Sequence, residues 1–128
     1  MANAIVWADI PVIDLDRARE FYSKLLGREM VVMPGMEDVA VPAPAGNENE
    51  VAFDLFRGIS EPSELGTRIY FDAEGDIAGM IQRAEMAGGT VLSPPRDMGP
   101  MVGIIAFVRD TEGNQIGLRQ DSAQQAPQ

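Results

Sequence analysis

The sequence predicts an α+β fold with two β-α-β-β-β repeats that form a curved mixed sheet around a cavity, with the helices on the outer face. Three observations favour this fold. Short stretches of alternating apolar residues indicate strands, and two longer stretches have apolar residues at helical spacing. The order strand-helix-strand-strand-strand then occurs twice, and Gly89, which ends the second helix, follows its counterpart Gly27 by 62 positions.

The first repeat covers about residues 4–57 and begins with a strand over 5–12, where apolar residues alternate with residues of mixed chemistry. Asp14 is suited to cap a helix that runs through Leu26, and Gly27 provides its end. The stretch between the last two strands, rich in Pro, Ala, Gly and Asn, is typical of a loop. The remaining strands of this repeat are expected at 29–33, 38–41 and 51–56, with the loop at 42–49.

The second repeat covers about residues 66–120 and has the same order of elements. Asp76 is suited to cap its helix, and Gly88 with Gly89 ends it. The segment 110–114, Asp-Thr-Glu-Gly-Asn, predicts a hairpin turn before the last strand. The polar segment 121–128 is expected to be a disordered tail, and the whole chain a single domain. Strands of this repeat are expected at 68–71, near 91, at 104–109 and at 115–119.

Two registers relate the first strands of the repeats. An offset of 62 residues places Arg68 and Tyr70 on the side that packs on the helix, where burying an arginine without a partner is costly. An offset of 61 places Phe71 there, and leaves Arg68 and Tyr70 on the same side as Trp7. We favour 61, with one extra residue in the connection formed by Glu74 and Gly75.

Composition excludes several classes of function. Twenty acidic and ten basic residues give a net charge of −10, which opposes binding to nucleic acid and tolerates cationic ligands. The chain has no cysteine and no histidine, so disulfides, thiolate ligands and Ser-His or Cys-His nucleophiles are absent. No apolar run reaches the roughly 18 residues of a membrane helix, and the N-terminus lacks a signal-peptide pattern. We therefore expect a cytoplasmic protein.

Two motifs resemble the vicinal-oxygen-chelate superfamily, which includes glyoxalase I, extradiol dioxygenases, fosfomycin-resistance enzymes and bleomycin-binding proteins. The segment 14–27, DLDRAREFYSKLLG, is similar to its first helix, and 109–118, RDTEGNQIGL, to its closing hairpin. The strand WADIPV at 7–12 and the Gly88-Gly89 pair resemble a subgroup of glyoxalase-like predicted enzymes. The resemblance covers residue 5 to about residue 120, and implies the paired-repeat fold.

The resemblance also places the metal ligands of metal-using members, which are His or Glu on the first and last strands of each repeat. These positions fall at Trp7, at Asp54, at Arg68 (or Ile69 in the other register) and at Gly117. Only Asp54 is an acid, and a single carboxylate does not hold a transition metal. We therefore expect no cofactor. An oxygen-only site for Mg²⁺ or Ca²⁺ from Asp9, Asp54 and Asp72 is the alternative, against ordinary solvated or ion-paired acids.

The side chains expected to face the cavity combine aromatic rings with a few polar groups, as in pockets for organic ligands. Trp7 is suited to stacking on a flat or cationic ligand, or to filling the core. Asp9 is the candidate general base, with Tyr70 beside it, unless it forms an ion pair with Arg68. The ligand-binding set is Trp7, Asp54, Phe56, Arg68, Gln115 and Arg119, and the catalytic pair is Asp9 and Tyr70.

Flexible methionines mark a second candidate region. Met30, Met33 and Met36 lie around the second strand, and Met98 and Met101 in a loop flanked by prolines and glycines. Thioether side chains suit either packing, a subunit interface or an adaptable pocket rim, and the loop suits a cover.

Two functions are compatible with these features. The first is a metal-independent small-molecule-binding protein, a homodimer similar to the bleomycin-binding branch. The second is a lyase or isomerase that acts on a small carbonyl compound, with Asp9 as general base and with Tyr70 and Arg68 stabilising an oxyanion. Whether the cavity lies within one chain or across a dimer is open.

Overall fold

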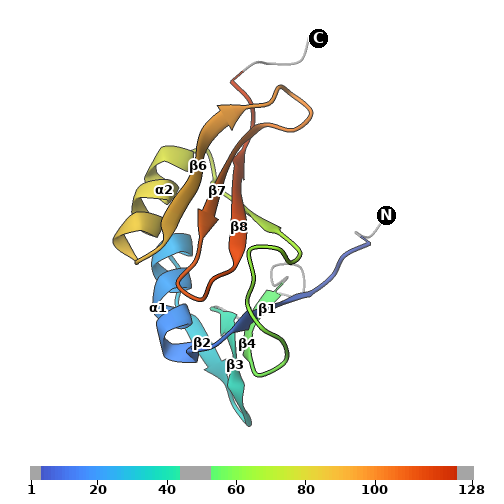
Figure 1. The fold of residues 1–128 in the computed structure, drawn as a ribbon, viewed down its shortest axis with the longest axis vertical. Helices are drawn as coiled ribbons and strands as arrows, with labels where there is room; N and C mark the ends of the chain where they lie inside the picture. Colours follow the sequence, from blue (N-terminus) through green and yellow to red (C-terminus); the bar gives the residue numbers. More distant parts are fainter. Residues whose placement is uncertain (1–3, 44–52, 124–128) are drawn as a thin grey trace. The chain divides into compact units, whose positions relative to one another are not determined.

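The computed structural model describes residues 4–43 and 53–123. It divides into two compact units, Met1–Pro62 and Ser63–Gln128, each of which carries one strand-helix-strand-strand-strand set (Figure 1). Each unit is a mixed four-stranded sheet with one helix, which confirms the predicted α+β fold with two repeats. The grouping of the repeats into a single domain stays a prediction. In the part of the chain described, no helix is long and apolar enough to cross a membrane.

The first unit has the sheet order β1-β4-β3-β2. Strands β1 and β4 run parallel, whereas β3 is antiparallel to both β4 and β2. The helix packs on β2, β3 and β4. The elements are β1 (Ala8–Val12), α1 (Leu15–Leu26), β2 (Met30–Met33), β3 (Met36–Pro42) and β4 (Phe53–Arg57).

Helix α1 begins and ends where its capping residues require. The Asp14 carboxylate accepts from the Arg17 backbone N–H, and Gly27 adopts a left-handed conformation, with φ 66°, that ends the helix. Its apolar residues recur at helical spacing, so they lie on one face and form the core of the unit. The buried residues of this face are Leu15, Ala18, Phe21, Tyr22 and Leu25.

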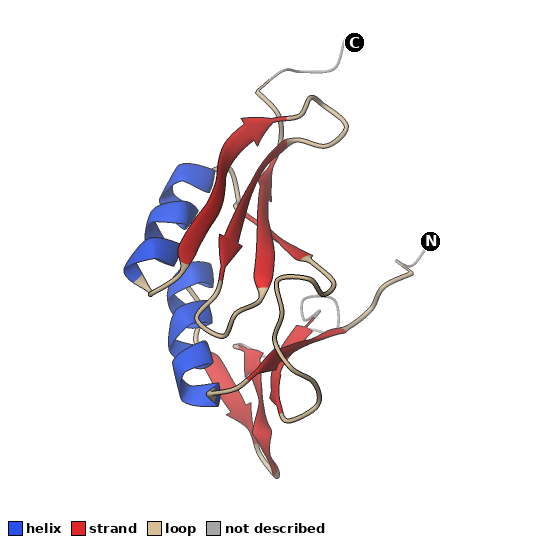
Figure 2. Ribbon diagram, viewed as in Figure 1, coloured by secondary structure: helices blue, strands red, loops and turns tan. Residues whose placement is uncertain are grey.

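The second unit has the sheet order β5-β8-β7-β6, with β5 parallel to β8 and the other pairs antiparallel. The Asp76 carboxylate caps α2, and the helix packs on β6, β7 and β8 (Figure 2). The elements are β5 (Ile69–Asp72), α2 (Ile77–Met86), β6 (Thr90–Asp97), β7 (Ile104–Arg109) and β8 (Gln115–Gln120).

Burial in β1 and β5, the first strands of the two units, confirms that an offset of 61 residues relates them. Phe71 and Ala73 are buried like Ile10 and Val12, whereas Arg68, Tyr70 and Asp72 are exposed. The extra residue lies in the turn before α2, where Glu74 and Gly75 both have positive φ, 52° and 83°. The Glu74 backbone N–H donates to the Asp72 carboxylate at 2.8 Å, which holds this turn.

Two predicted boundaries are wrong. Strand β1 begins at Ala8, so Trp7 precedes it. Strand β6 is longer than the short strand expected near residue 91, because it continues through Pro94 and Pro95. It tolerates them as an edge strand with register shifts, where the missing N–H groups cost little.

The loop proposed as a cover is therefore reduced to a tight turn between β6 and β7. The Met98 backbone N–H donates to Gly103 O, and the Gly103 N–H to Gly99 O. Met30 is buried in the core of the first unit, whereas Met36, Met98 and Met101 are exposed. Of the predicted loop 42–49 and the tail 121–128, residues 44–49 and 124–128 lie outside the described residues, as do positions 51 and 52 of the fourth predicted strand.

Candidate functional site

In the first unit, four predicted site residues lie on or beside two adjacent parallel strands. The register pairs Asp9 with Asp54 and Pro11 with Phe56, so these side chains share one face of the sheet. Leu55 points to the opposite face and is fully buried. Trp7 joins the group, because its indole Nε1–H donates to Asp54 Oδ2 at 3.1 Å. The structure therefore brings Trp7, Asp9 and Asp54 together.

Asp54 is the electrostatically unusual member of this group. Its side chain is only 5% exposed, and Oδ1 is buried without a donor among the described residues. Burial raises the pKa of Asp54 to about 6; the Trp7 hydrogen bond opposes the shift, and the neighbouring Asp9 adds to it. Two ionised carboxylates cannot donate to each other. A protonated Asp54 carboxyl can donate a hydrogen bond to Asp9, which agrees with the raised pKa of Asp54.

In the second unit, Arg68 and Tyr70 form a cluster with Phe107 of β7. Arg68 Nη2 donates to the Tyr70 hydroxyl at 2.9 Å, and the guanidinium carbon lies 3.8 Å from the centre of the Phe107 ring. The two rings meet edge to face, with centres 5.9 Å apart. The guanidinium is thus held by a hydrogen bond and by stacking on an aromatic face.

Gly117 makes the position of Tyr70 possible. The register places Gly117 directly beside Tyr70 and opposite Phe107. A Cβ atom at Gly117 would clash with Tyr70 Cδ2, because it would lie closer than real contacts allow. The Tyr70 ring therefore occupies the space above Gly117, where the resemblance places a metal-binding acid.

The other predicted residues of this unit have ordinary structural roles in the structure. Arg119 donates from Nε to the Val102 carbonyl at 2.8 Å and pairs with Asp121 at 3.2 Å, so it fastens the turn before β7. Gln115 opposes Arg109 at the start of β8. Phe107 was not among the predicted site residues, because the strand at 104–109 is apolar on both faces. Only its pairing with Gly117 shows that its side chain lies on the same face of the sheet as Tyr70.

These side chains do not fit the metal site that the resemblance implies. In the first unit the ligand positions hold the Trp7 indole and the Asp54 carboxylate, which are hydrogen-bonded to each other. In the second unit they hold Arg68 and Gly117, and the Tyr70 ring covers the glycine. Among residues 4–43 and 53–123, no three His, Cys, Asp or Glu side chains are grouped to hold an ion. The cavity shared by both repeats and the Asp9–Arg68 ion pair combine residues of the two units and stay predictions.

A separate depression of about 340 Å³ lies at the β2–β3 hairpin of the first unit. Phe56 lines it, but Trp7, Asp9 and Asp54 do not. One acid of its wall, Asp38, is already paired with Arg57 at 2.6 Å. The depression is therefore distinct from the acid pair. Its lining residues are Gly35, Met36, Glu37, Asp38, Val39 and Phe56.

Comparison with known proteins identifies a family and several proteins that this chain resembles. The model of the Glyoxalase/Bleomycin resistance protein/Dioxygenase superfamily matches residues 4–118. A "Glyoxylase-like domain-containing protein" of Didymella fabae is 28% identical over 112 residues, which are 83% of this chain and 84% of that protein.

Two solved structures share the fold at lower identity. One is a mutant of FosX, a genomically encoded fosfomycin resistance protein from Listeria monocytogenes, complexed with Mn(II) and 1S,2S-dihydroxypropylphosphonic acid (TM-score 0.64, 15% identity, 96% of this chain and 94% of that chain). The other is TnmS3, an antibiotic binding protein from Streptomyces sp. CB03234 (TM-score 0.62, 23% identity, 94% of this chain and 98% of that chain). At these identities the comparison shows a common fold.

Proposed function

Because the chain belongs to the Glyoxalase/Bleomycin resistance protein/Dioxygenase superfamily, we propose that it is a metal-independent small-molecule-binding protein. The observation that carries the proposal is the packing of Tyr70 over Gly117, since an aromatic ring fills the place of a ligand acid. The Trp7–Asp54 hydrogen bond supports it, because it engages the one remaining carboxylate of the ligand set. The antibiotic-binding relative TnmS3 is a precedent for binding on this fold.

The ligand is a small organic molecule with a flat apolar part. Trp7 and Tyr70 are each 44% exposed, so each offers an aromatic surface next to polar groups that orient a ligand. Beside Trp7 the polar group is the Asp9–Asp54 pair, and beside Tyr70 it is Arg68.

Metal analysis and ligand screening test this function together. Protein purified without chelator is expected to contain far less than one equivalent of transition metal. A thermal-shift screen of aromatic metabolites is expected to raise the melting temperature, since a ligand that binds only the folded state stabilises it by mass action. One equivalent of tightly bound metal, with ligand binding lost when it is removed, would contradict the proposal.

The second candidate is a lyase or isomerase for a small carbonyl compound, with Asp9 as general base and Tyr70 as its catalytic partner. The Asp9–Asp54 pair favours it, because the register places Asp9 directly beside an acid whose pKa is raised to about 6, and two adjacent carboxyl groups suit general acid–base catalysis. Asp9→Asn should then abolish turnover and leave the melting temperature unchanged. A fall of several degrees instead would show that Asp9 is structural.

Two further features belong to this proposal. We expect a homodimer, which sedimentation velocity of the full chain tests, and a cytoplasmic location, which localisation of the tagged full chain tests. A monomer at micromolar concentration would contradict the first expectation without affecting the binding function.

A further inference from the structure

Arg68 is held differently from the five basic residues that form ion pairs in the structure. Arg19, Lys24, Arg57, Arg109 and Arg119 each pair with a carboxylate within 3.2 Å. Among the described residues of its own unit, Arg68 forms no ion pair with a carboxylate, although acids outnumber bases two to one in the sequence. Its partners are instead a hydroxyl and an aromatic ring.

These partners fix the guanidinium without neutralising its charge. Stacking on Phe107 at 3.8 Å sets the plane of the group, and the Nη2 bond to Tyr70 sets its rotation in that plane. A guanidinium presents five N–H donors in a rigid fork, and the Tyr70 hydroxyl engages one of them. The remaining donors and the exposed position suit a bidentate acceptor from outside the protein.

We propose that Arg68, oriented by Tyr70 and Phe107, is the anchor for an oxyanionic group of the ligand, a carboxylate or a phosphonate. The inference rests on the proposed binding function and names the ligand class for the second unit. Both kinds of group offer paired oxygens that match the guanidinium fork. The Phe107 and Tyr70 rings beside the anchor favour a ligand whose anionic group is attached to a flat apolar part.

Gly117 is the specificity-determining position of this site. The Tyr70 ring reaches its place only because Gly117 has no side chain, so a Cβ there displaces the ring and with it the hydroxyl that holds Arg68. The site thus depends on an absent side chain at the position where metal-using relatives are expected to have an acid.

Four probes of similar shape and different charge test the proposal by chemical-shift titration of the full-length protein. Benzoate and phenylphosphonate are the anions, benzamide is the neutral analogue and benzamidine the cation. We expect benzoate, phenylphosphonate or both to bind and to shift the signals of residues 68, 70, 107 and 117, and benzamide to bind about tenfold more weakly. The ratio between the two anions decides between carboxylate and phosphonate.

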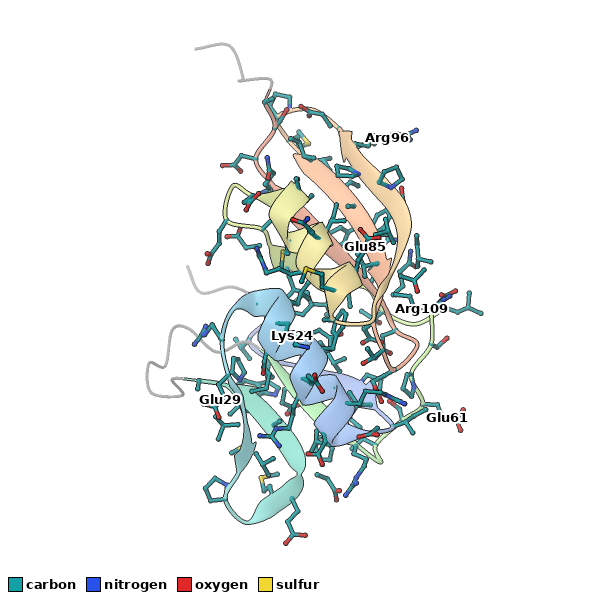
Figure 3. All side chains as sticks on the ribbon, turned by 90° about the vertical axis from the view of Figure 1, so that its left-hand side faces the viewer. Lys24, Glu29, Glu61, Glu85, Arg96 and Arg109 are labelled. Carbon is teal, nitrogen blue, oxygen red and sulfur yellow. The ribbon has the colours of Figure 1, made fainter. Side chains whose placement is uncertain are left out.

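Three variants and a matched control separate the anchor from a general charge effect. Arg68→Lys keeps the charge but removes the fork, and Tyr70→Phe removes only the hydroxyl; each should weaken anion binding, the first about tenfold. Gly117→Ala should weaken it while the chain stays folded. Arg96, on edge strand β6, is the control: its side chain extends away from the ribbon in Figure 3, and Arg96→Lys should change nothing.

The outcomes also distinguish this proposal from the binding function on which it rests. Benzamidine binding at residues 7, 9 and 54 without anion binding would overturn the anionic site and leave small-molecule binding intact. Equal binding of benzoate to the native protein and to Arg68→Lys would also overturn it. If neither the four probes nor the thermal-shift screen give binding, both proposals fail.

Discussion

Three equivalent positions carry different chemistry in the two units. Trp7, Asp9 and Asp54 of the first unit correspond to Arg68, Tyr70 and Gly117 of the second, because the register pairs Asp9 with Asp54 and Tyr70 with Gly117. In the first unit an indole binds a buried acid, whereas in the second a guanidinium binds a hydroxyl above a glycine. The shared fold therefore presents an acid pair on one unit and a cation on the other.

The raised pKa of Asp54 predicts how stability depends on pH. The folded state binds this proton up to about pH 6, whereas the unfolded carboxyl has a pKa of 3.8. Its contribution to stability is complete below about pH 4 and is lost as the pH rises through 6. Two pKa units correspond to at most about 3 kcal/mol.

Asp54→Asn removes the loss of stability that accompanies the rise in pH, since the amide does not ionise. The amide can still accept a hydrogen bond from Trp7 and donate one to Asp9. Thermal unfolding from about pH 4 to 8 should show little difference from the native protein at the acidic end and a more stable variant at the alkaline end. Glu29→Gln, on the surface between α1 and β2 (Figure 3), is the control and should not change the pH dependence. A variant destabilised equally at every pH would contradict the assignment of the proton to Asp54.

The sequence alone predicted on which face of the sheet these residues lie, but not which hydrogen bonds they form. Alternation in two short strands, together with the cost of burying Arg68, was enough to place Arg68, Tyr70 and Asp72 away from the helix. Asp9 was the predicted base, yet Asp54 is the buried, shifted acid. Burial depends on which strand lies at the centre of the sheet, and single-strand periodicity does not contain that information.

At the scale of elements, the turn between β7 and β8 is held by one carboxylate. Asp110 is buried, and its Oδ1 accepts from the backbone N–H groups of Glu112, Gly113 and Asn114 at 2.8 to 2.9 Å. Its Oδ2 accepts from the Asn114 side chain. This turn therefore positions strand β8, which carries Gly117.

Asp110→Ala should therefore lower the free energy of unfolding by about 2 to 4 kcal/mol, because it leaves three backbone donors without their acceptor. Denaturant unfolding measures the loss. Asp110→Asn keeps one oxygen for these donors and should cost less than half as much. Equal losses in the two variants would show that charge, and not the shared acceptor, holds the turn.

The elements were predicted well where local capping decides them and less well at sheet edges. Asp14, Gly27 and Asp76 act through neighbours in the sequence, so both helices were predicted within about one residue. Pro94 and Pro95 argue against a strand, but β6 is an edge strand in which their missing N–H groups are tolerated. Edge position is a property of the whole sheet and is not readable from the prolines themselves.

At the scale of the whole molecule, the net charge of −10 acts on every charged ligand, whichever residue it binds. At about 0.01 M ionic strength the screening length is about 30 Å, so charges across the molecule contribute, whereas at about 0.15 M it is about 8 Å. The short contact between Arg68 and an anion lies within both lengths. Added salt therefore weakens the long-range repulsion of an anion more than it weakens the contact itself.

Benzoate should consequently bind about two to three times more tightly at about 0.15 M than at about 0.01 M salt. Benzamide, which has no charge, should bind equally at both, and a cation should show the opposite trend. Titrations at the two ionic strengths, in the native protein and in Arg68→Lys, measure these ratios. A benzoate affinity that falls with salt would mean that the local ion pair outweighs the charge of the molecule, and that the acidic surface does not oppose anionic ligands.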